Sequence, residues 1–365
     1  MNRILSRLWI ALSVLALGMA RAALAAVELK PDDHVVLVGG ALADRMQHSG
    51  HFEALLHARL PQHRLVFRNL AAAGDEVGVR HRSENFGSPD DWLKRTQADV
   101  ILGFFGANEA ARGPAGIERF RGELTAWLRH VRGQNYSGKG APRVVLFSPI
   151  LQERHLDSNF ADPAPMNANL RLYATAMGEV ARAEGVPFVD LIGASETIYA
   201  AARARQVSLT VNGYLLTSEG DRQLAPFLYA GLFDAKPADS NLEKLRLAIN
   251  EKNHEWHQRY RTIDGYNVYG GRSVLAYQPG KGGFISDRNA PEPYVSNYKV
   301  MQEEMAVRDV LTANRDKVVW AAAGGREIEP DDSNLPKVTK VTSNKPGKGP
   351  DGKHEFLGGE EAISK

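Results

Sequence analysis

The fold of this chain is decided by Val35-Val36-Leu37-Val38-Gly39-Gly40-Ala41-Leu42-Ala43-Asp44-Arg45. A short apolar run ends in two glycines and then enters a helical pattern. In an open α/β sheet, the first parallel strand delivers a turn and a helix N-terminus to the edge where ligands bind, beyond the carboxyl ends of the strands. The residues at this turn should therefore decide the function, yet Gly39, Gly40 and Ala41 carry no reactive group.

Four more apolar runs are predicted to be strands of the same sheet: residues 64–68, 99–105, 143–147 and 186–191. Amphipathic helical stripes separate them, and strands that alternate with helices indicate a parallel, doubly wound sheet with right-handed crossovers. We therefore expect an α/β fold, with three α/β/α layers and a five-stranded parallel sheet of the flavodoxin-like type, over residues 30–235.

The chain changes character after this domain. A closing helix is expected over residues 215–233, with Ser218 as its N-cap. Apolar residues at helical spacing predict a further helix over residues 242–260 and another over 300–314, whereas residues 264–298 show no clear period.

Residues 236–330 are therefore expected to form a helical and irregular extension. From residue 331 to 365 large apolar residues are few. Such a composition cannot bury enough surface to offset its ordering entropy, so this segment is predicted to be a flexible linker or tail.

The first 25 residues are typical of a secretory signal peptide. Arg3 and Arg7 precede an apolar region over residues 8–19, which is short for a membrane span, and Ala23-Leu24-Ala25 supplies a small-x-small cleavage site. We expect cleavage and an exported protein, periplasmic or extracellular, with no transmembrane segment after cleavage. An uncleaved N-terminal anchor is the alternative.

Composition excludes several function classes. The 45 basic and 43 acidic residues give a net charge of +2, which offers no electrostatic basis for binding nucleic acid. The absence of cysteine excludes disulfides, a thiolate nucleophile and a thiolate metal site. No Walker or Rossmann fingerprint completes the Gly39-Gly40 turn, and no cofactor is expected.

Two strand-end loops carry candidate binding groups. The backbone N–H of Gly74 and the side-chain amide of Asn108 could both donate to an oxyanion. Taken singly, each residue could equally serve an ordinary turn. Their position after adjacent strands, together with the Gly39-Gly40 turn, favours a functional rim.

The order of four blocks resembles the SGNH (GDSL-like) hydrolase family over about residues 35–233. These blocks are Gly39-Gly40-Ala41, Asn69 to Asp75, Gly106-Ala107-Asn108-Glu109, and Asn212 to Gly220. The resemblance implies a three-layer esterase, lipase or deacetylase fold acting on acyl esters, with an acylated sugar or glycan as a ligand.

The same resemblance implies that the catalytic groups are missing. Ala41 stands at the nucleophile position, after Gly40 at the aspartate position of Gly-Asp-Ser. Asn212 stands at the acid position and Leu215 at the position of the histidine base. A methyl group cannot attack a carbonyl. The oxyanion residues of the family match Gly74 and Asn108.

Other polar residues could substitute for the missing base. Glu153 and His155 follow the fourth strand at the same rim, and Gly40 and Glu109 are possible auxiliary residues. Two readings stay open: an ester hydrolase with a rearranged base, or a non-catalytic module that binds a glycan or a protein.

More narrowly, the chain resembles the SGNH-like domain at the front of large exported proteins of planctomycete-type bacteria. Glu251-Lys252-Asn253 and residues 359–365 carry this resemblance. It implies downstream domains, namely a dehydrogenase-like propeller and a c-type haem module. This chain itself cannot hold haem through C-x-x-C-H, because it has no cysteine.

Two groups of histidines have spacings that could suggest metal binding. His48, His51 and His57 lie close together in sequence, and His254 and His257 are three residues apart on a predicted helix. Neither group shows a complete ligand set, so solvated or packing histidines are expected and no metal is predicted.

Overall fold

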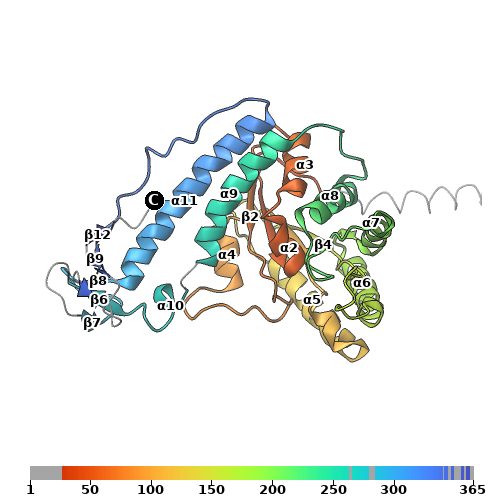
Figure 1. Ribbon diagram of the computed structural model, residues 1–365, viewed down its shortest axis with the longest axis horizontal. Helices are drawn as coiled ribbons and strands as arrows, with labels where there is room; N and C mark the ends of the chain where they lie inside the picture. Colours follow the sequence, from red (N-terminus) through yellow and green to blue (C-terminus); the bar gives the residue numbers. More distant parts are fainter. Residues whose placement is uncertain are drawn as a thin grey trace, which may run out of the picture. The chain divides into compact units, whose positions relative to one another are not determined.

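The computed structural model describes residues 27–262, 265–278 and 284–339, and the backbone of four short strands beyond residue 340 (Figure 1). The predicted signal peptide lies outside the described residues. Within them, no helix is long and apolar enough to cross a membrane. The chain forms two compact units: residues up to 80 together with 90–247, and residues 81–89 together with 248 onward.

The first unit contains a five-stranded parallel sheet in the order β2-β1-β3-β4-β5. The strands are β1 (His34–Gly39), β2 (Val66–Asn69), β3 (Val100–Phe104), β4 (Arg143–Phe147) and β5 (Phe188–Val189). The central strands β1 and β3 are almost entirely buried, as strands covered on both faces should be. The predicted fold class is confirmed.

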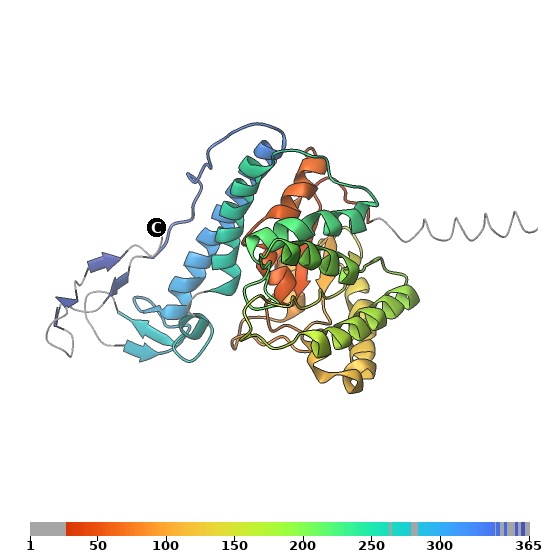
Figure 2. The same cartoon turned by 45° about the vertical axis from the view of Figure 1, so that its right-hand side comes forward.

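The helices cover both faces of this sheet, and Figures 1 and 2 show α3 beside α8 and α5 beside α6. The strand order reverses at β1, so right-handed crossovers put the helices before and after that reversal on opposite faces. Their bounds are α2 (Ala41–Met46), α3 (His51–Arg59), α4 (Pro89–Arg95), α5 (Ile117–Arg132), α6 (Ala164–Glu184), α7 (Ile192–Ala204) and α8 (Ser218–Phe233), with short 3₁₀ turns at Glu109–Arg112 and Pro114–Gly116.

The turn after β1 depends on Gly39. Its φ of +122° lies in a region that L side chains rarely adopt, and a Cβ there would lie 2.0 Å from the carbonyl oxygen of Phe104 on β3. Gly40 follows as the N-cap of α2, and its N–H donates to the same Phe104 oxygen at 2.9 Å. The glycine pair therefore lets the end of β1 lie directly against the end of β3.

Helix α8 begins later than the sequence predicted. It starts at Ser218, not at residue 215, and its N-cap is Thr217, not Ser218. The Thr217 hydroxyl accepts a hydrogen bond from the N–H of Gly220. The preceding residues are held instead in a tight loop, closed by a bridge between Thr210 and Leu216.

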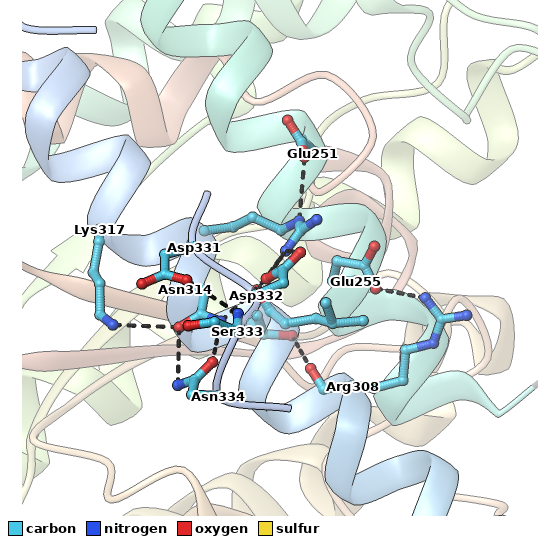
Figure 3. Close-up of polar contacts among 12 residues, drawn as sticks. Glu251, Glu255, Arg308, Asn314, Lys317, Asp331, Asp332, Ser333 and Asn334 are labelled. Atoms are coloured by element: carbon cyan, nitrogen blue, oxygen red, sulfur yellow. Dashed lines mark hydrogen bonds and ion pairs between the residues drawn. The ribbon is translucent and has the colours of Figure 1, made fainter. Parts of the chain in front are cut away.

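The second unit is built on two long helices, α9 (Glu243–Arg261) and α11 (Asn297–Ala323). Arg308 pairs with Glu255 at 2.5 Å, and Arg315 pairs with Glu251 at 3.2 Å. Residues later in one helix thus meet residues earlier in the other, so the helices run antiparallel (Figure 3). Between them lie α10 (Gly265–Val268) and a small antiparallel sheet of β6 (Leu275–Tyr277), β7 (Phe284–Ser286) and β8 (Val295–Ser296).

Residues 325–339, here called the strap, run back along α11 (Figures 1 and 3). Arg315 donates to both carboxylate oxygens of Asp332, at 2.9 and 3.1 Å, and the Thr339 hydroxyl donates to Glu303 at 2.9 Å. The strap overlaps the first residues of the predicted flexible tail. Short strand pairs follow, formed by β9 (Val341–Ser343), β10 (Gly347–Lys348), β11 (Glu355–Phe356) and β12 (Gly359–Glu361).

A short segment from the middle of the chain, residues 81–89, belongs to the second unit. Phe86 packs edge-on against Tyr260 and Tyr269, with ring centroids 5.4 and 5.3 Å away. The Asn85 side chain donates to the Tyr269 carbonyl at 3.2 Å. The two units are therefore interlaced along the sequence.

Candidate functional site

The candidate site is the rim formed by the carboxyl ends of the parallel strands in the first unit. Ala41 is the first residue of α2, directly after the Gly39-Gly40 turn, and it is only 4% exposed. Gly40 lies next to the loop after β3, since a Cβ there would lie 3.3 Å from Nδ2 of Asn108. The first and third of the four blocks thus meet at the rim.

Asn108 links two strand-end loops. Its Nδ2 donates to the carbonyl oxygens of Ala73 and Asp75, both at 2.9 Å. A side-chain amide has only two hydrogens, so these contacts use both. In this arrangement an incoming acyl oxygen finds no unbound hydrogen on Asn108, which instead holds the loop after β2 against the loop after β3.

Glu109 strengthens the same link from inside. It is 1% exposed, and its carboxylate accepts hydrogen bonds from the N–H groups of Val77 and Gly106, both at 2.9 Å. Burial raises the pKa of Glu109, although these backbone donors oppose the shift. Both carboxylate oxygens are occupied, so Glu109 positions the loops around Asn108.

Gly74 differs from Asn108 in being open to solvent. Its backbone N–H has no hydrogen-bond partner among the described residues, and a Cβ at this position would meet no atom within 4 Å. Of the two candidate oxyanion donors, Gly74 therefore presents an unbound hydrogen at the rim.

The loop that contains Asn212 and Leu215 is folded on itself. Oδ1 of Asn212 accepts hydrogen bonds from the N–H groups of Tyr214 at 3.1 Å and Leu215 at 2.8 Å. This is the Asx turn that an asparagine side chain commonly forms. Asn212 thus shapes the turn that places the aliphatic side chain of Leu215.

Glu153 holds this loop from the end of β4. It is 6% exposed, and its carboxylate accepts from the N–H of Leu209 at 3.0 Å and from the N–H and hydroxyl of Thr210 at 2.9 and 2.6 Å. Its own N–H donates to the Gly213 carbonyl at 2.6 Å. These hydrogen bonds make Glu153 a positioning group for the loop that contains Leu215.

His155 lies in the same connection but points to a local partner. Its Nδ1 accepts a hydrogen bond from the N–H of Asp157 at 3.1 Å, and its ring packs on Phe160 with centroids 4.2 Å apart. A neutral imidazole whose Nδ1 accepts carries its proton on Nε2. In this tautomer His155 has no lone pair free to take a proton from a nucleophile.

Two of the histidines considered for metal binding have partners within the fold. His57 is buried, contacts Glu53 at 3.4 Å and packs on Phe67. His51 lies 3.5 Å from the Ser218 hydroxyl. Within the described residues no group of three or more carboxylate or imidazole side chains is arranged to hold a metal ion.

The model of the GDSL-like lipase/acylhydrolase family matches residues 38–223, just over half of the chain. The chain belongs to this family. The match begins at the end of β1 and ends within α8, so it spans the sheet and every rim loop described above. The earlier resemblance is confirmed at the level of the family; the planctomycete-type context remains a prediction.

Solved structures of GDSL-like and related hydrolases are similar at low identity. A protein from Parabacteroides merdae described as a GDSL-like lipase is 15% identical, with a TM-score of 0.44 over 56% of this chain and 98% of its own. An acetylxylan esterase from Geobacillus stearothermophilus is 13% identical, with a TM-score of 0.43 over 59% and 100%. An α/β hydrolase from the Lake Arreo metagenome is 17% identical, with a TM-score of 0.42 over 56% and 96%. No curated protein matches the chain.

The predicted loops follow the carboxyl ends of the strands in the structure, but the sequence could not identify their hydrogen-bond partners. The sequence allowed Glu153 to act as a base, whereas its carboxylate is used by Leu209 and Thr210, more than fifty positions away. The sequence did not single out Thr210 at all. No local pattern marks such a contact, because both partners are ordinary loop residues until the chain is folded.

Proposed function

We propose that this chain is a non-hydrolytic member of the GDSL-like family, which keeps the rim of an esterase without its reactive groups. The observation that carries the proposal is the pair of aliphatic residues Ala41 and Leu215 at the nucleophile and base positions. Ester cleavage by this route needs a hydroxyl and a base to activate it. An alanine and a leucine supply neither.

The neighbouring polar groups support this proposal. The carboxylates of Glu109 and Glu153 accept hydrogen bonds from backbone N–H groups of neighbouring loops, and Nδ1 of His155 accepts one from the N–H of Asp157. A rearranged base would have to break one of these arrangements first. The hydrolytic alternative therefore rests on family membership alone.

The proposed role is to bind an acylated sugar or glycan outside the cell. The exposed N–H of Gly74 is the group that could still receive an acyl oxygen, as such amides do in oxyanion holes. The proposal of export is based on the signal-like N-terminus. The proposal of downstream domains is based on the resemblance to large exported proteins of planctomycete-type bacteria. A protein ligand is the alternative occupant of the rim.

An ester assay tests the loss of catalysis. The purified protein is incubated with a short-chain acyl ester and with a serine-reactive fluorophosphonate, and we expect neither turnover above buffer nor labelling. Turnover that disappears in Glu153→Gln or His155→Ala would establish the hydrolytic alternative. An exposed-loop variant, Asp157→Asn, serves as the control for non-specific loss.

A restoration experiment locates the defect. The triple variant A41S/N212D/L215H returns the family's residues to the three positions. Because both Asn108 hydrogens are bound by backbone carbonyls, we expect it to gain fluorophosphonate labelling at position 41 without efficient ester turnover. Turnover at the level of an ordinary esterase would show that Asn108 is free to serve an oxyanion.

Calorimetry tests the binding role. An acetylated oligosaccharide is expected to bind and its deacetylated form to bind at least tenfold more weakly, since the acyl oxygen is the recognised group. Gly74→Pro removes the N–H and should abolish the difference. Equal binding of both forms would exclude recognition of the acyl group.

A further inference from the structure

A buried cluster away from the rim loops joins α8 to the connection between α2 and α3. The hydroxyl of Ser49 donates a hydrogen bond to Oδ2 of Asp221, and the backbone amide of His51 faces the same carboxyl group. Asp221 is only 3% exposed. The proposed binding role uses none of these residues, so their arrangement needs a separate explanation.

Two buried atoms of this cluster have no hydrogen-bond partner in the described part of the chain. They are Oδ1 of Asp221 and Nε of Arg45, which lies on α2. Arg45 also interacts electrostatically with Asp221. Leaving either a carboxylate oxygen or a guanidinium N–H buried and unpaired is costly. One contact between the two would relieve both costs.

We infer that Arg45 and Asp221 are the two halves of an ion pair between α2 and α8, which forms when the Asp221 carboxyl group releases its proton to solvent. With the proton present, Asp221 is neutral and Arg45 gains little by approaching. Once the proton is lost, a buried negative charge faces the guanidinium, and attraction in a low-dielectric interior draws the two together.

The protonation state of Asp221 changes in a physiological range of pH. Burial raises the pKa of Asp221 to about 6, against the opposing effects of the Ser49 hydroxyl, the His51 amide and Arg45. Because this pKa lies above the ordinary value, the folded protein keeps the proton in mild acid and releases it as the pH rises through about 6. The pair is thus open in mild acid and closed at neutral pH.

No other charged side chain competes for Asp221 among the described residues. Four charged groups near the cluster face the imidazole of His51 instead; they are Arg222 and Glu219 on α8, and Arg246 and Glu243 at the start of α9. Burial, and then Arg246 and Arg222, lower the pKa of His51. Helix α3, strand β5 and helix α7 also pack on α8, but apart from the backbone amide of His51 they place no titratable group of the described residues against Asp221.

The pair would connect the two segments that carry the altered catalytic positions. Arg45 shares α2 with Ala41, and Asp221 lies in the first turn of α8, which follows the loop that contains Leu215. Closing the pair moves one end of each segment toward the other. The rim therefore changes with pH whether or not it binds an acylated sugar.

A carboxyl-carbon NMR titration of the whole protein between pH 4 and 8 tests this inference, with Asp221→Asn identifying the resonance. Removing the cation in Arg45→Met is expected to raise the apparent pKa of Asp221 by one unit or more. Arg222→Met on the same helix is the matched control and should shift it by less than about 0.3 unit. Equal shifts in the two variants would overturn the inference.

A second measurement covers variants that fail to fold. In the wild type, hydrogen exchange of the α2 amides, corrected for intrinsic pH dependence, should slow as the pH rises from 5 to 7. Arg45→Lys keeps the positive charge and should preserve this slowing. Ser49→Ala leaves both charged groups in place and should preserve it as well. A corrected exchange rate that is independent of pH in the wild type would contradict the pairing.

Discussion

At the scale of single residues, polar side chains around Ala41 hold the rim together. Asn108 gives both amide hydrogens to one neighbouring loop, and Glu109 ties the same loop from its buried side. Glu153 fixes the loop of Leu215 in the same way. A reactive rim needs polar groups that can bind or activate a substrate. The hydrogen bonds of these three side chains instead hold the rim loops in place.

The glycines of the rim give a sharp prediction about stability. Gly39→Ala should lower the free energy of unfolding by about 3 kcal/mol or more, because its Cβ would overlap the Phe104 carbonyl and its φ is unfavourable for alanine. Gly74→Ala is the matched control and should change it by less than about 0.5 kcal/mol. Urea denaturation followed by circular dichroism measures both, and similar losses would contradict the geometry.

At the scale of elements, helix ends were predicted less well than helix centres. The helix expected over 300–314 continues to Ala323, because no residue before Gly324 breaks it. The helix expected from 215 starts at Ser218, since Asn212 and Glu153 hold the preceding loop in another conformation. In both cases the apolar spacing marked the buried face but not where hydrogen bonding stops.

The strap offers a test at this scale. Asp332→Ala removes the carboxylate that Nη1 of the half-buried Arg315 contacts, and should make local opening of residues 325–339 easier by about 1–2 kcal/mol, roughly tenfold in hydrogen exchange. Asp331→Ala is the control, because Asp331 is exposed, accepts a hydrogen bond from Ser333 in its own turn, and interacts with α11 through the charge of Lys317 and not through Arg315. Faster exchange in both variants would show that the Arg315 contact is not what holds the strap.

The contact with Arg315 also has a defined pH dependence. Burial raises the pKa of Asp332, but hydrogen bonds from Arg315 and Asn314 outweigh it and hold that pKa below the ordinary value. A lowered folded-state pKa means that the contact contributes fully above the unfolded-state value and is lost as the pH falls through the folded-state value. The strap should therefore loosen only in acid.

At the scale of the whole molecule, each of the two units contains residues from more than one stretch of the sequence. Residues 81–89 leave the first unit and pack in the second through Phe86. Conversely, the start of α9 belongs to the first unit, where Leu245 is buried and Arg246 donates to the Ser49 carbonyl at 3.1 Å. Neither unit is a continuous piece of sequence.

This interlacing predicts the result of a single cut. A protease site inserted at residues 238–240, which are exposed, should give two fragments that elute together in native gel filtration, because each fragment completes the other's unit. Adding Phe86→Ala removes an aromatic anchor and should increase dissociation. Two separate peaks from the cleaved parent protein would show that the exchanged segments contribute little to the assembly.

The fold could be predicted from sequence to a large extent, and the site only in part. Apolar runs that end in Gly39-Gly40 and Gly106 marked parallel strands, since burial on both faces imposes continuous hydrophobicity. The position of Gly74 and Asn108 at the rim followed from the strand order. The sequence did not show whether the amide hydrogens of Asn108 are free, because they bind carbonyl groups some thirty-five positions away.

The sequence by itself determined the class of fold and the fact that Ala41 and Leu215 carry neither a hydroxyl nor an imidazole in any conformation. Only the tertiary structure decided what the remaining polar groups do. It occupied Asn108 and Glu153 with backbone partners, and it buried Asp221 against Ser49, 172 positions away. Covalent identity is local, whereas hydrogen bonding and burial depend on which distant segments the fold brings together.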